Sequence, residues 1–146
     1  MKALKIAIGC DHAGYSVKEE VKKYLEDLGY QVWDFGTHSD ESVDYPDIAH
    51  PLSKAVTEGD YSFGILLCGS GNGMAITANK YKGIRAAVSW NEEIARLARL
   101  HNNANICAIP ARYLHIADTK LIVKAFLETE FEGGRHSRRV DKIPIQ

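Results

Sequence analysis

The residues best suited to chemistry lie in one loop, Cys68-Gly69-Ser70-Gly71-Asn72-Gly73. The loop follows an apolar run, residues 63–67, and leads into a helix-like segment from Met74. A glycine-rich turn before a helix leaves backbone N–H groups free to bind an anion, and the same groups stabilise a nearby thiolate. The loop therefore predicts a basic thiol beside an anion site.

Three familiar glycine-loop motifs fit this stretch poorly. A dinucleotide loop should lead to an acidic residue ending the next strand, and none clearly does so here. A Cys-x5-Arg phosphatase loop needs arginine where Met74 stands, and a Walker loop needs Gly-Lys-Ser or Gly-Lys-Thr. Simple burial of Cys68 as a small hydrophobe remains the alternative. For Cys10 and Cys107, in or beside apolar runs, core packing is the better account.

Two further pairs of residues could do chemistry. Asp11 and His12 come directly after the first apolar run, where they could exchange protons with sugar hydroxyls or contact a phosphate. The alternative for Asp11 is to cap the helix that follows. His101 and Asn102 end an amphipathic segment, where a histidine could merely complement a helix C-terminus.

The basic cluster 133–139 contains Arg135, His136, Arg138 and Arg139. Guanidinium groups match phosphate oxygens bidentately, and Arg112 in the Pro110-Ala111-Arg112 turn could add a further contact. The alternative is a solvated tail. A nucleic-acid tail would need more charge than this.

Composition indicates one domain, residues 1–146, because a second domain has no room in 146 residues. The net charge of -1 offers no general attraction to nucleic acid or anionic membranes. Three cysteines without a CxxC pair argue against a disulfide framework and a zinc site. No apolar run approaches the ~18 residues of a membrane span. We therefore expect a soluble cytoplasmic protein with no membrane or nucleic-acid partner.

Short apolar runs alternate with amphipathic ones along the chain. The runs predict five strands, at 5–9, 31–35, 63–67, 85–89 and 106–109. Helices are expected at about 17–28, 46–59, 74–79, 91–100 and 115–129, followed by an unstructured tail, 132–146. This alternation favours an α/β fold in which helices cover both faces of a parallel sheet.

Ligands of such sheets bind at the carboxyl ends of the strands. Three segments that could do chemistry follow predicted strands: Asp11-His12, the Cys68 loop, and Trp90-Asn91 leading to the helix that carries His101. We expect them to converge on one edge of the sheet.

The order and spacing of several short motifs resemble those of the ribose-5-phosphate isomerase B family, which includes relatives acting on hexose 6-phosphates. The resemblance spans nearly the whole chain. The motifs are Gly9-Cys10-Asp11-His12-Ala13-Gly14, Asp44-Tyr45-Pro46-Asp47, the Cys68 loop, Ala78-Asn79-Lys80, Arg99-Leu100-His101-Asn102 and Gly133-Gly134-Arg135-His136.

The resemblance implies a Rossmann-like three-layer sandwich with a five-stranded parallel sheet. It also implies an isomerase without metal or cofactor that interconverts ribose 5-phosphate and ribulose 5-phosphate through a cis-enediolate. The active sites would be shared between two subunits of a homodimer, which could pair into a tetramer. The C-terminal arginine cluster is too distant in the sequence to fold locally. This is consistent with arginines that reach a neighbouring subunit.

The same resemblance assigns a role to each candidate residue. Cys68 is the base that moves the proton between C2 and C1, and Ser70 with the backbone amides of Gly69, Gly71, Asn72 and Gly73 stabilises the enediolate oxygen. His101 assists ring opening, Asp11 handles a hydroxyl proton, Asn102 orients the substrate and Tyr45 lines the pocket. The phosphate is held by His12, Arg112, Arg135 and Arg139.

Some members of this family lack the loop cysteine and use a glutamate at the position of Met74. This chain resembles the cysteine type in having Cys68 and no such glutamate, although its Ser70-Gly71-Asn72-Gly73 stretch resembles the glutamate type more closely. Ser70 stands where many cysteine-type members have threonine, which keeps the hydroxyl. Pentose or hexose preference stays open. The rival hypothesis is a non-catalytic module that binds a nucleotide or phosphate through the glycine loop.

Overall fold

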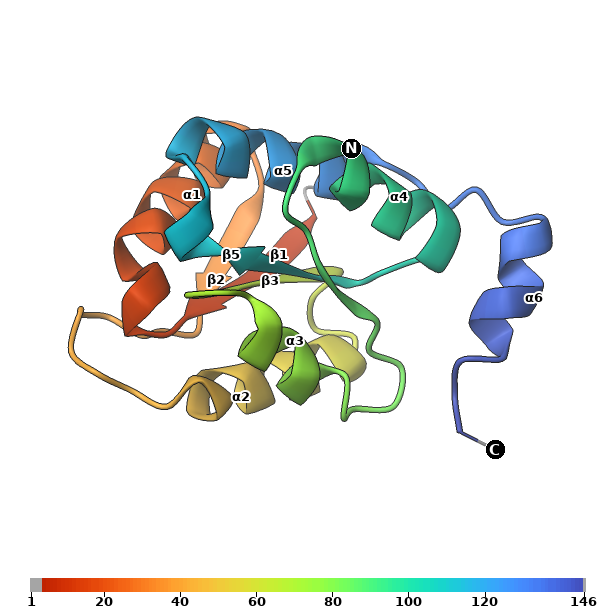
Figure 1. Ribbon diagram of the computed structural model, residues 1–146, viewed down its shortest axis with the longest axis horizontal. Coiled ribbons are helices and arrows are strands. Elements are labelled where there is room, and N and C mark those ends of the chain that lie inside the picture. Colours follow the sequence, from red (N-terminus) through yellow and green to blue (C-terminus); the bar gives the residue numbers. More distant parts are fainter. Residues whose placement is uncertain (1–3, 146) are drawn as a thin grey trace.

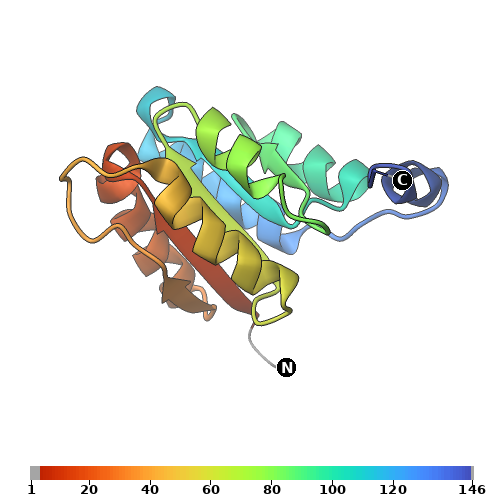
Figure 2. The same ribbon diagram turned by 90° about the horizontal axis from the view of Figure 1, so that it is seen from below.

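The computed structural model describes residues 4–145 as an α/β sandwich (Figures 1 and 2). The strands are β1 (Lys5–Cys10), β2 (Gln31–Asp34), β3 (Phe63–Cys68), β4 (Ala86–Val88) and β5 (Ile106–Pro110). The helices are α1 (Tyr15–Asp27), α2 (Tyr45–Thr57), α3 (Asn72–Ala78), α4 (Glu92–Asn102), α5 (Ile116–Glu128) and α6 (Arg135–Asp141), with 3-10 turns η1 (His12–Gly14) and η2 (Ala111–Tyr113). Among these residues, no helix is long and apolar enough to cross a membrane.

The five strands form one parallel sheet in the order β2-β1-β3-β5-β4, which confirms the predicted fold class. β3 lies at the centre, with β1 and β5 as its neighbours. In this register Cys10 is paired with Leu67 and Cys68 with Pro110. The first, third and fifth strands therefore end together, and the loops that follow them share one edge.

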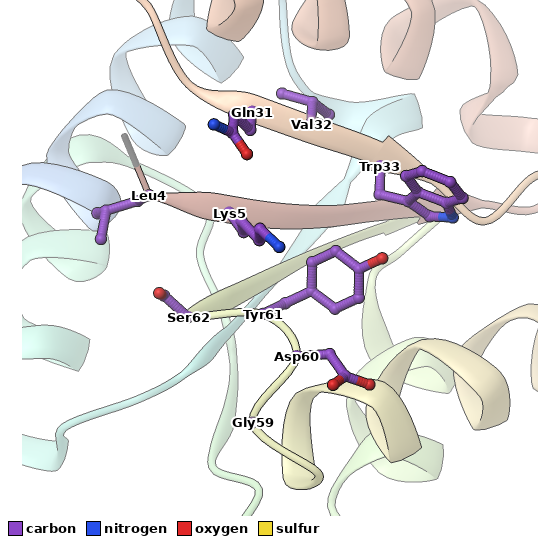
Figure 3. A pocket seen from close by; sticks show the side chains of 9 residues that line it. All are labelled: Leu4, Lys5, Gln31, Val32, Trp33, Gly59, Asp60, Tyr61 and Ser62. Atoms are coloured by element: carbon purple, nitrogen blue, oxygen red, sulfur yellow. The ribbon is translucent and has the colours of Figure 1, made fainter. Parts of the chain in front are cut away.

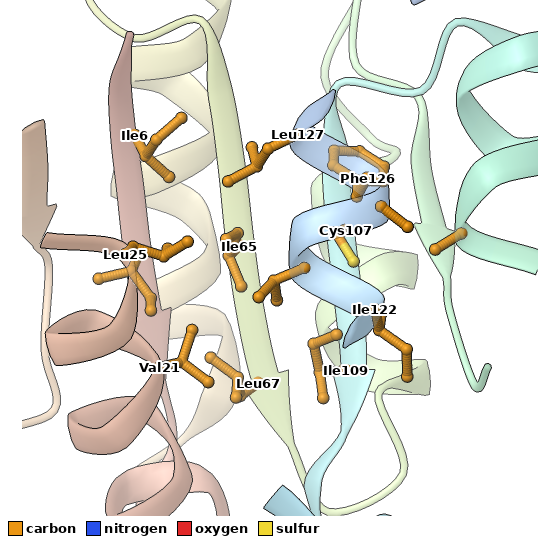
Figure 4. Packing of buried hydrophobic residues seen from close by; sticks show 14 of the residues in the cluster. Ile6, Val21, Leu25, Ile65, Leu67, Cys107, Ile109, Ile122, Phe126 and Leu127 are labelled. Atoms are coloured by element: carbon orange, nitrogen blue, oxygen red, sulfur yellow. The ribbon is translucent and has the colours of Figure 1, made fainter. Parts of the chain in front are cut away.

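Side-chain alternation along the strands divides the core into two layers. In β3, Ile65 and Leu67 face a cluster built with α1, α4 and α5, part of which Figure 4 shows. Leu66 and Cys68 face the second cluster, built with α2 and α3. Cys68 therefore points to the α2–α3 side of the sheet, at its carboxyl edge.

The predicted unstructured tail, 132–146, is wrong over much of its length. Gly133 and Gly134 have positive φ values of 71° and 56° and turn the chain after α5, and α6 begins at Arg135. The helix stands beyond the sheet, beside the end of α4 (Figure 1). His136 anchors it there, because this side chain is buried and stacks on His101 with ring centroids 4.3 Å apart.

Candidate active site

A pocket of about 270 Å³ lies at the carboxyl edge of the sheet, where β1, β3 and β5 end. It contains residues predicted from four separate segments of the sequence. Its lining consists of Asp11, Tyr45, Cys68, Gly69, Ser70, Gly73, Arg112 and Tyr113. The expected convergence of Asp11 with the Cys68 loop is therefore confirmed, and Arg112, predicted as a phosphate contact, lines the same pocket.

Two glycines of the loop are required by close approach to other parts of the chain. Gly71 has φ 78°, and a Cβ there would lie 3.2 Å from the backbone of β5. A Cβ on Gly73 would lie 2.7 Å from the ring of Tyr45. The glycines thus let the loop fold tightly onto β5 and under Tyr45, which places the Cys68 and Ser70 side chains at the pocket.

Ser70 is exposed, and its hydroxyl oxygen accepts a hydrogen bond from the backbone N–H of Asn72 at 3.3 Å. This contact leaves the hydroxyl proton available to donate toward the pocket. It also occupies the Asn72 amide, one of the amides predicted to face the substrate. The loop therefore offers its donors mainly through the Ser70 hydroxyl and the remaining amides.

Asp11 has both of the roles considered from the sequence. One carboxylate oxygen, Oδ1, accepts hydrogen bonds from Ala13 N (2.9 Å) and Gly14 N (3.3 Å), which caps η1. The residue also lines the pocket. Because these bonds fix the carboxylate, Asp11 presents an oriented acceptor at the pocket wall.

His12 follows Asp11, and a contact with the loop before α2 determines which of its ring nitrogens can donate a hydrogen bond. Nδ1 of His12 accepts a hydrogen bond from Val43 N at 3.2 Å. In a neutral ring this places the proton on Nε2, which becomes the donor for a bound anion.

A buried ion pair joins Lys18 Nζ and Asp34 Oδ1, which are 2.8 Å apart. Because Lys18 also donates to the Thr37 carbonyl, this pair fixes the start of the same loop.

Arg112 lies against the glycine loop. Its backbone N–H donates to the Gly69 carbonyl at 3.1 Å, and its Nη1 lies 3.2 Å from where a Cβ on Gly69 would stand. A guanidinium is thereby brought to the pocket that holds Cys68. The neighbouring Tyr113, 76% exposed, also lines the pocket and was missed from the sequence, although its place just after β5 signals that edge.

The three cysteines differ in the way the sequence predicted. Burial raises the pKa of Cys10 to about 11 and that of Cys107 to about 12. Both are 0% exposed within the core. Cys68 is 5% exposed and is the cysteine that reaches the pocket, so it is the thiol that can meet a substrate.

The expected convergence of His101 on the same edge is wrong within one chain. β4 and β5 are parallel, so α4, which connects them, runs back toward the amino ends of the strands. His101 and Asn102 lie at the end of α4, shortly before β5 begins. A six-residue strand spans about 20 Å, so His101 and Cys68 lie at opposite ends of the sheet.

The predicted C-terminal arginines lie with His101 rather than with Cys68. Arg135 and Arg139 are exposed on α6, which packs against α4. Two other arginines secure the end of α4. Arg85 Nε donates to the carbonyls of Asn102 and Asn103, and Arg99 donates to Asn103 Oδ1 and the Ala104 carbonyl. Hydrogen bonds therefore hold the end of α4 in place. His101, Asn102, Arg135 and Arg139 lie together there, and we call them the amino-end cluster.

A larger hollow of about 840 Å³ lies beside the amino ends of β1 and β2 (Figure 3). Its walls include Trp33 and Tyr61, with Lys5 and Asp60 as charged groups. None of the predicted site residues lines it. The smaller pocket, which several predicted site residues line, is therefore the candidate active site.

The chain is similar to known proteins over nearly its whole length. A model of the Ribose/Galactose Isomerase family matches residues 6–143. Ribose-5-phosphate isomerase B of Escherichia coli is 45% identical over 139 residues, which are 95% of this chain and 93% of that protein. D-erythrulose-4-phosphate isomerase of Pectobacterium atrosepticum is 43% identical over 141 residues, 96% of this chain and 93% of that protein.

Solved structures are equally similar. The ribose 5-phosphate isomerase of Thermotoga maritima superposes with a TM-score of 0.95 at 51% identity, covering 97% of this chain and 98% of that one. Ribose-5-phosphate isomerase B of Mycoplasma genitalium, with bound ribulose-5-phosphate, gives 0.92 at 39% identity, covering 98% and 95%. The sequence and the fold lead to one conclusion: this chain belongs to the Ribose/Galactose Isomerase family.

Proposed function

We propose that the protein interconverts ribose 5-phosphate and ribulose 5-phosphate, with Cys68 as the base and without a metal ion. The observation that carries the proposal is the pocket in which the Cys68 thiol, the Ser70 hydroxyl, the Asp11 carboxylate and the Arg112 guanidinium meet. The similarity to isomerases named for ribose 5-phosphate supports this substrate.

In the proposed reaction the Cys68 thiolate removes the proton from C2 of the open-chain aldose. The electron pair forms the C1–C2 double bond, and negative charge develops on O1. Cys68 returns the proton to C1, and the proton of the O2 hydroxyl passes to O1. These two transfers produce the ketose. The Ser70 hydroxyl and the free loop amides stabilise the enediolate oxygen, which is the role that a metal ion would otherwise have.

Arg112 and His12 hold the phosphate in this proposal. Arg112 lines the pocket, and His12 lies at the same edge because it follows β1, although it is not among the pocket-lining residues. Because Val43 N donates to Nδ1 of His12, Nε2 is the donor in a neutral ring. A phosphate fixed in this way holds C1 and C2 beside one thiol, so proton transfer occurs within one bound complex.

We further propose that two chains form each active site. One chain supplies the pocket at its carboxyl edge, and the second supplies His101, Asn102, Arg135 and Arg139. The opposite placement of the two groups within one chain supports this arrangement. His101 of the second chain then assists ring opening, and its arginines complete the phosphate site.

The test is the formation of ribulose 5-phosphate from ribose 5-phosphate, followed by NMR with metal-stripped enzyme and with a chelator present. We expect turnover to be unchanged by the chelator. The kcat/KM values for ribose 5-phosphate, allose 6-phosphate and D-erythrulose 4-phosphate should rank the first highest. Loss of turnover on chelation would contradict the metal-free mechanism, and a higher value for another sugar would reassign the substrate.

A further inference from the structure

A cluster of three potential metal ligands lies at the amino end of the sheet, away from Cys68. His101 ends α4, Glu132 precedes α6 and His136 lies on α6. One ligand atom from each of the three lies within 4.8 Å of the other two. Two imidazoles with one carboxylate form a ligand set that zinc adopts in proteins, with a fourth position left open.

The state of His136 is the second observation. Its side chain is 7% exposed, and its Nε2 atom is buried without a hydrogen-bond partner. The closest acidic atom is Glu132 Oε2 at 3.9 Å, which is too far for a hydrogen bond. Two ligands of one tetrahedral zinc, each about 2.0–2.1 Å from the ion, lie ~3.4 Å apart. The distance between His136 Nε2 and Glu132 Oε2 is therefore close to the distance between two ligand atoms of one ion.

The His101 ring is the part that must adjust. It stacks on His136 with an interplanar angle of 13°, and the lone pairs of parallel rings do not converge on one point. His101 is only partly buried at a helix end, so its ring can turn while His136 stays fixed.

We propose that His101, Glu132 and His136 bind one divalent transition-metal ion of the zinc class, and that the bound ion inhibits the enzyme. Imidazole and carboxylate ligands of this kind favour zinc, cobalt, nickel or copper over magnesium and calcium. Inhibition follows because a metal-bound His101 cannot exchange protons with the furanose ring. This consequence depends on the proposed function, whereas the binding site itself does not.

Binding is tested by titrating Zn²⁺ into untagged, metal-stripped protein in competition with a chromophoric chelator. A Cys68→Ser background removes the pocket thiol as a ligand. We expect one site per chain, at least tenfold weaker in Glu132→Gln and unchanged in Glu130→Gln, an exposed control two residues away. His136→Phe keeps a stacked ring without ligand nitrogens and should abolish binding, with circular dichroism confirming the fold. Equal affinity of the Glu132→Gln and Glu130→Gln variants would overturn the site.

The identity of the ligand atoms is tested by adding Co²⁺ to the wild-type protein. We expect visible ligand-field absorption without a near-ultraviolet thiolate band, since the three ligands are nitrogen and oxygen atoms. A thiolate band that disappears with Cys68→Ser would place the ion at Cys68 and overturn the proposal.

Inhibition is tested with the enzyme in its wild-type form. Zn²⁺ should lower isomerase turnover, a chelator should restore it, and Glu132→Gln should keep the basal rate while needing at least tenfold more Zn²⁺. An active enzyme whose zinc sensitivity is the same in Glu132→Gln would contradict this inference alone. Zinc binding at the cluster in a protein without isomerase activity would contradict the proposed function alone.

Discussion

The carboxyl-edge pocket and the amino-end cluster are two halves of the predicted site, and they are built in different ways. The pocket around Cys68 is formed by loops that leave adjacent parallel strands, so the sheet itself brings Asp11, Cys68 and Arg112 together. The cluster around His101 is formed where two helices meet beyond the sheet. One half is thus fixed by sheet register, and the other by packing between α4 and α6.

This difference shows why a single chain can carry a complete set of residues without a complete site. Helix α4 runs opposite to the strands, so every residue near its end is displaced by about the length of a strand from the carboxyl edge. In the proposed dimer, a second copy would supply the missing half without any change in the fold. The following experiments separate the two halves, beginning with the largest expected effect.

Replacing the pocket thiol should have the largest effect on activity. Cys68→Ala removes the proposed base, and we expect kcat to fall by about 10³-fold or more. The matched control is Cys10→Ala, because Cys10 ends the neighbouring strand but is buried in the core. Its kcat should stay within a few-fold of wild type. Near-native turnover of Cys68→Ala would exclude the cysteine base.

Mixing two inactive variants tests whether the halves come from different chains. Cys68→Ala and His101→Asn should each be nearly inactive alone. If the chains reassociate at random as dimers, half are mixed and each mixed dimer contains one intact site, so about a quarter of wild-type activity should return. Measurement after co-refolding gives the answer. Activity that stays at the level of the separate variants would contradict a shared site.

The arginines should have intermediate effects, expressed mainly in KM. Arg112→Ala and Arg139→Ala each remove a charged contact to phosphate, and KM should rise by about 10- to 100-fold. Arg138→Ala is the control, since Arg138 is exposed beside Arg139 on α6 but has no assigned contact. Steady-state kinetics distinguish the variants. An equal rise in KM for Arg138→Ala would indicate a general charge effect.

The buried ion pair should affect stability more than turnover. Burial of Asp34 opposes its charged form, but Lys18, Gly36 N–H and Lys22 outweigh this and keep the pKa of Asp34 below its ordinary value. Asp34→Asn leaves Lys18 buried without a counter-charge, and the free energy of unfolding should fall by about 3 kcal/mol. Urea unfolding at neutral pH provides this measurement.

The same pair predicts a pH dependence. Because its folded pKa is lowered, Asp34 stabilises the wild type above its unfolded pKa, about 3.9, and this contribution is lost as the pH falls below that value. Stability should therefore decline more steeply with acid in the wild type than in Asp34→Asn. Parallel declines would show that the pair is not the cause.

Much of the pocket could be predicted because it follows the periodicity of the strands. The apolar runs locate the strand ends: Asp11 follows β1, Cys68 is the last residue of β3, and Arg112 is the second residue after β5. The position of His101 could not be predicted in this way. The sequence shows that α4 follows the carboxyl end of β4, but it does not show that the last turn of α4 lies at the opposite edge of the sheet. Helix α6 was missed because two glycines precede it and its outer face is polar, while the contact that holds it is the single buried ring of His136.

The central position of β3 has a consequence for how long each half persists in an isolated chain. Its amides are hydrogen-bonded within a sheet that has strands on both sides, so we expect them to exchange with deuterium only through global unfolding. Helix α6 is short and lies at the periphery, where local opening suffices. We therefore expect the half-site at Cys68 to stay folded in an isolated chain, and the half-site at His101 to open locally unless a second chain covers α6. Slow exchange in α6 would then be a direct signal of assembly.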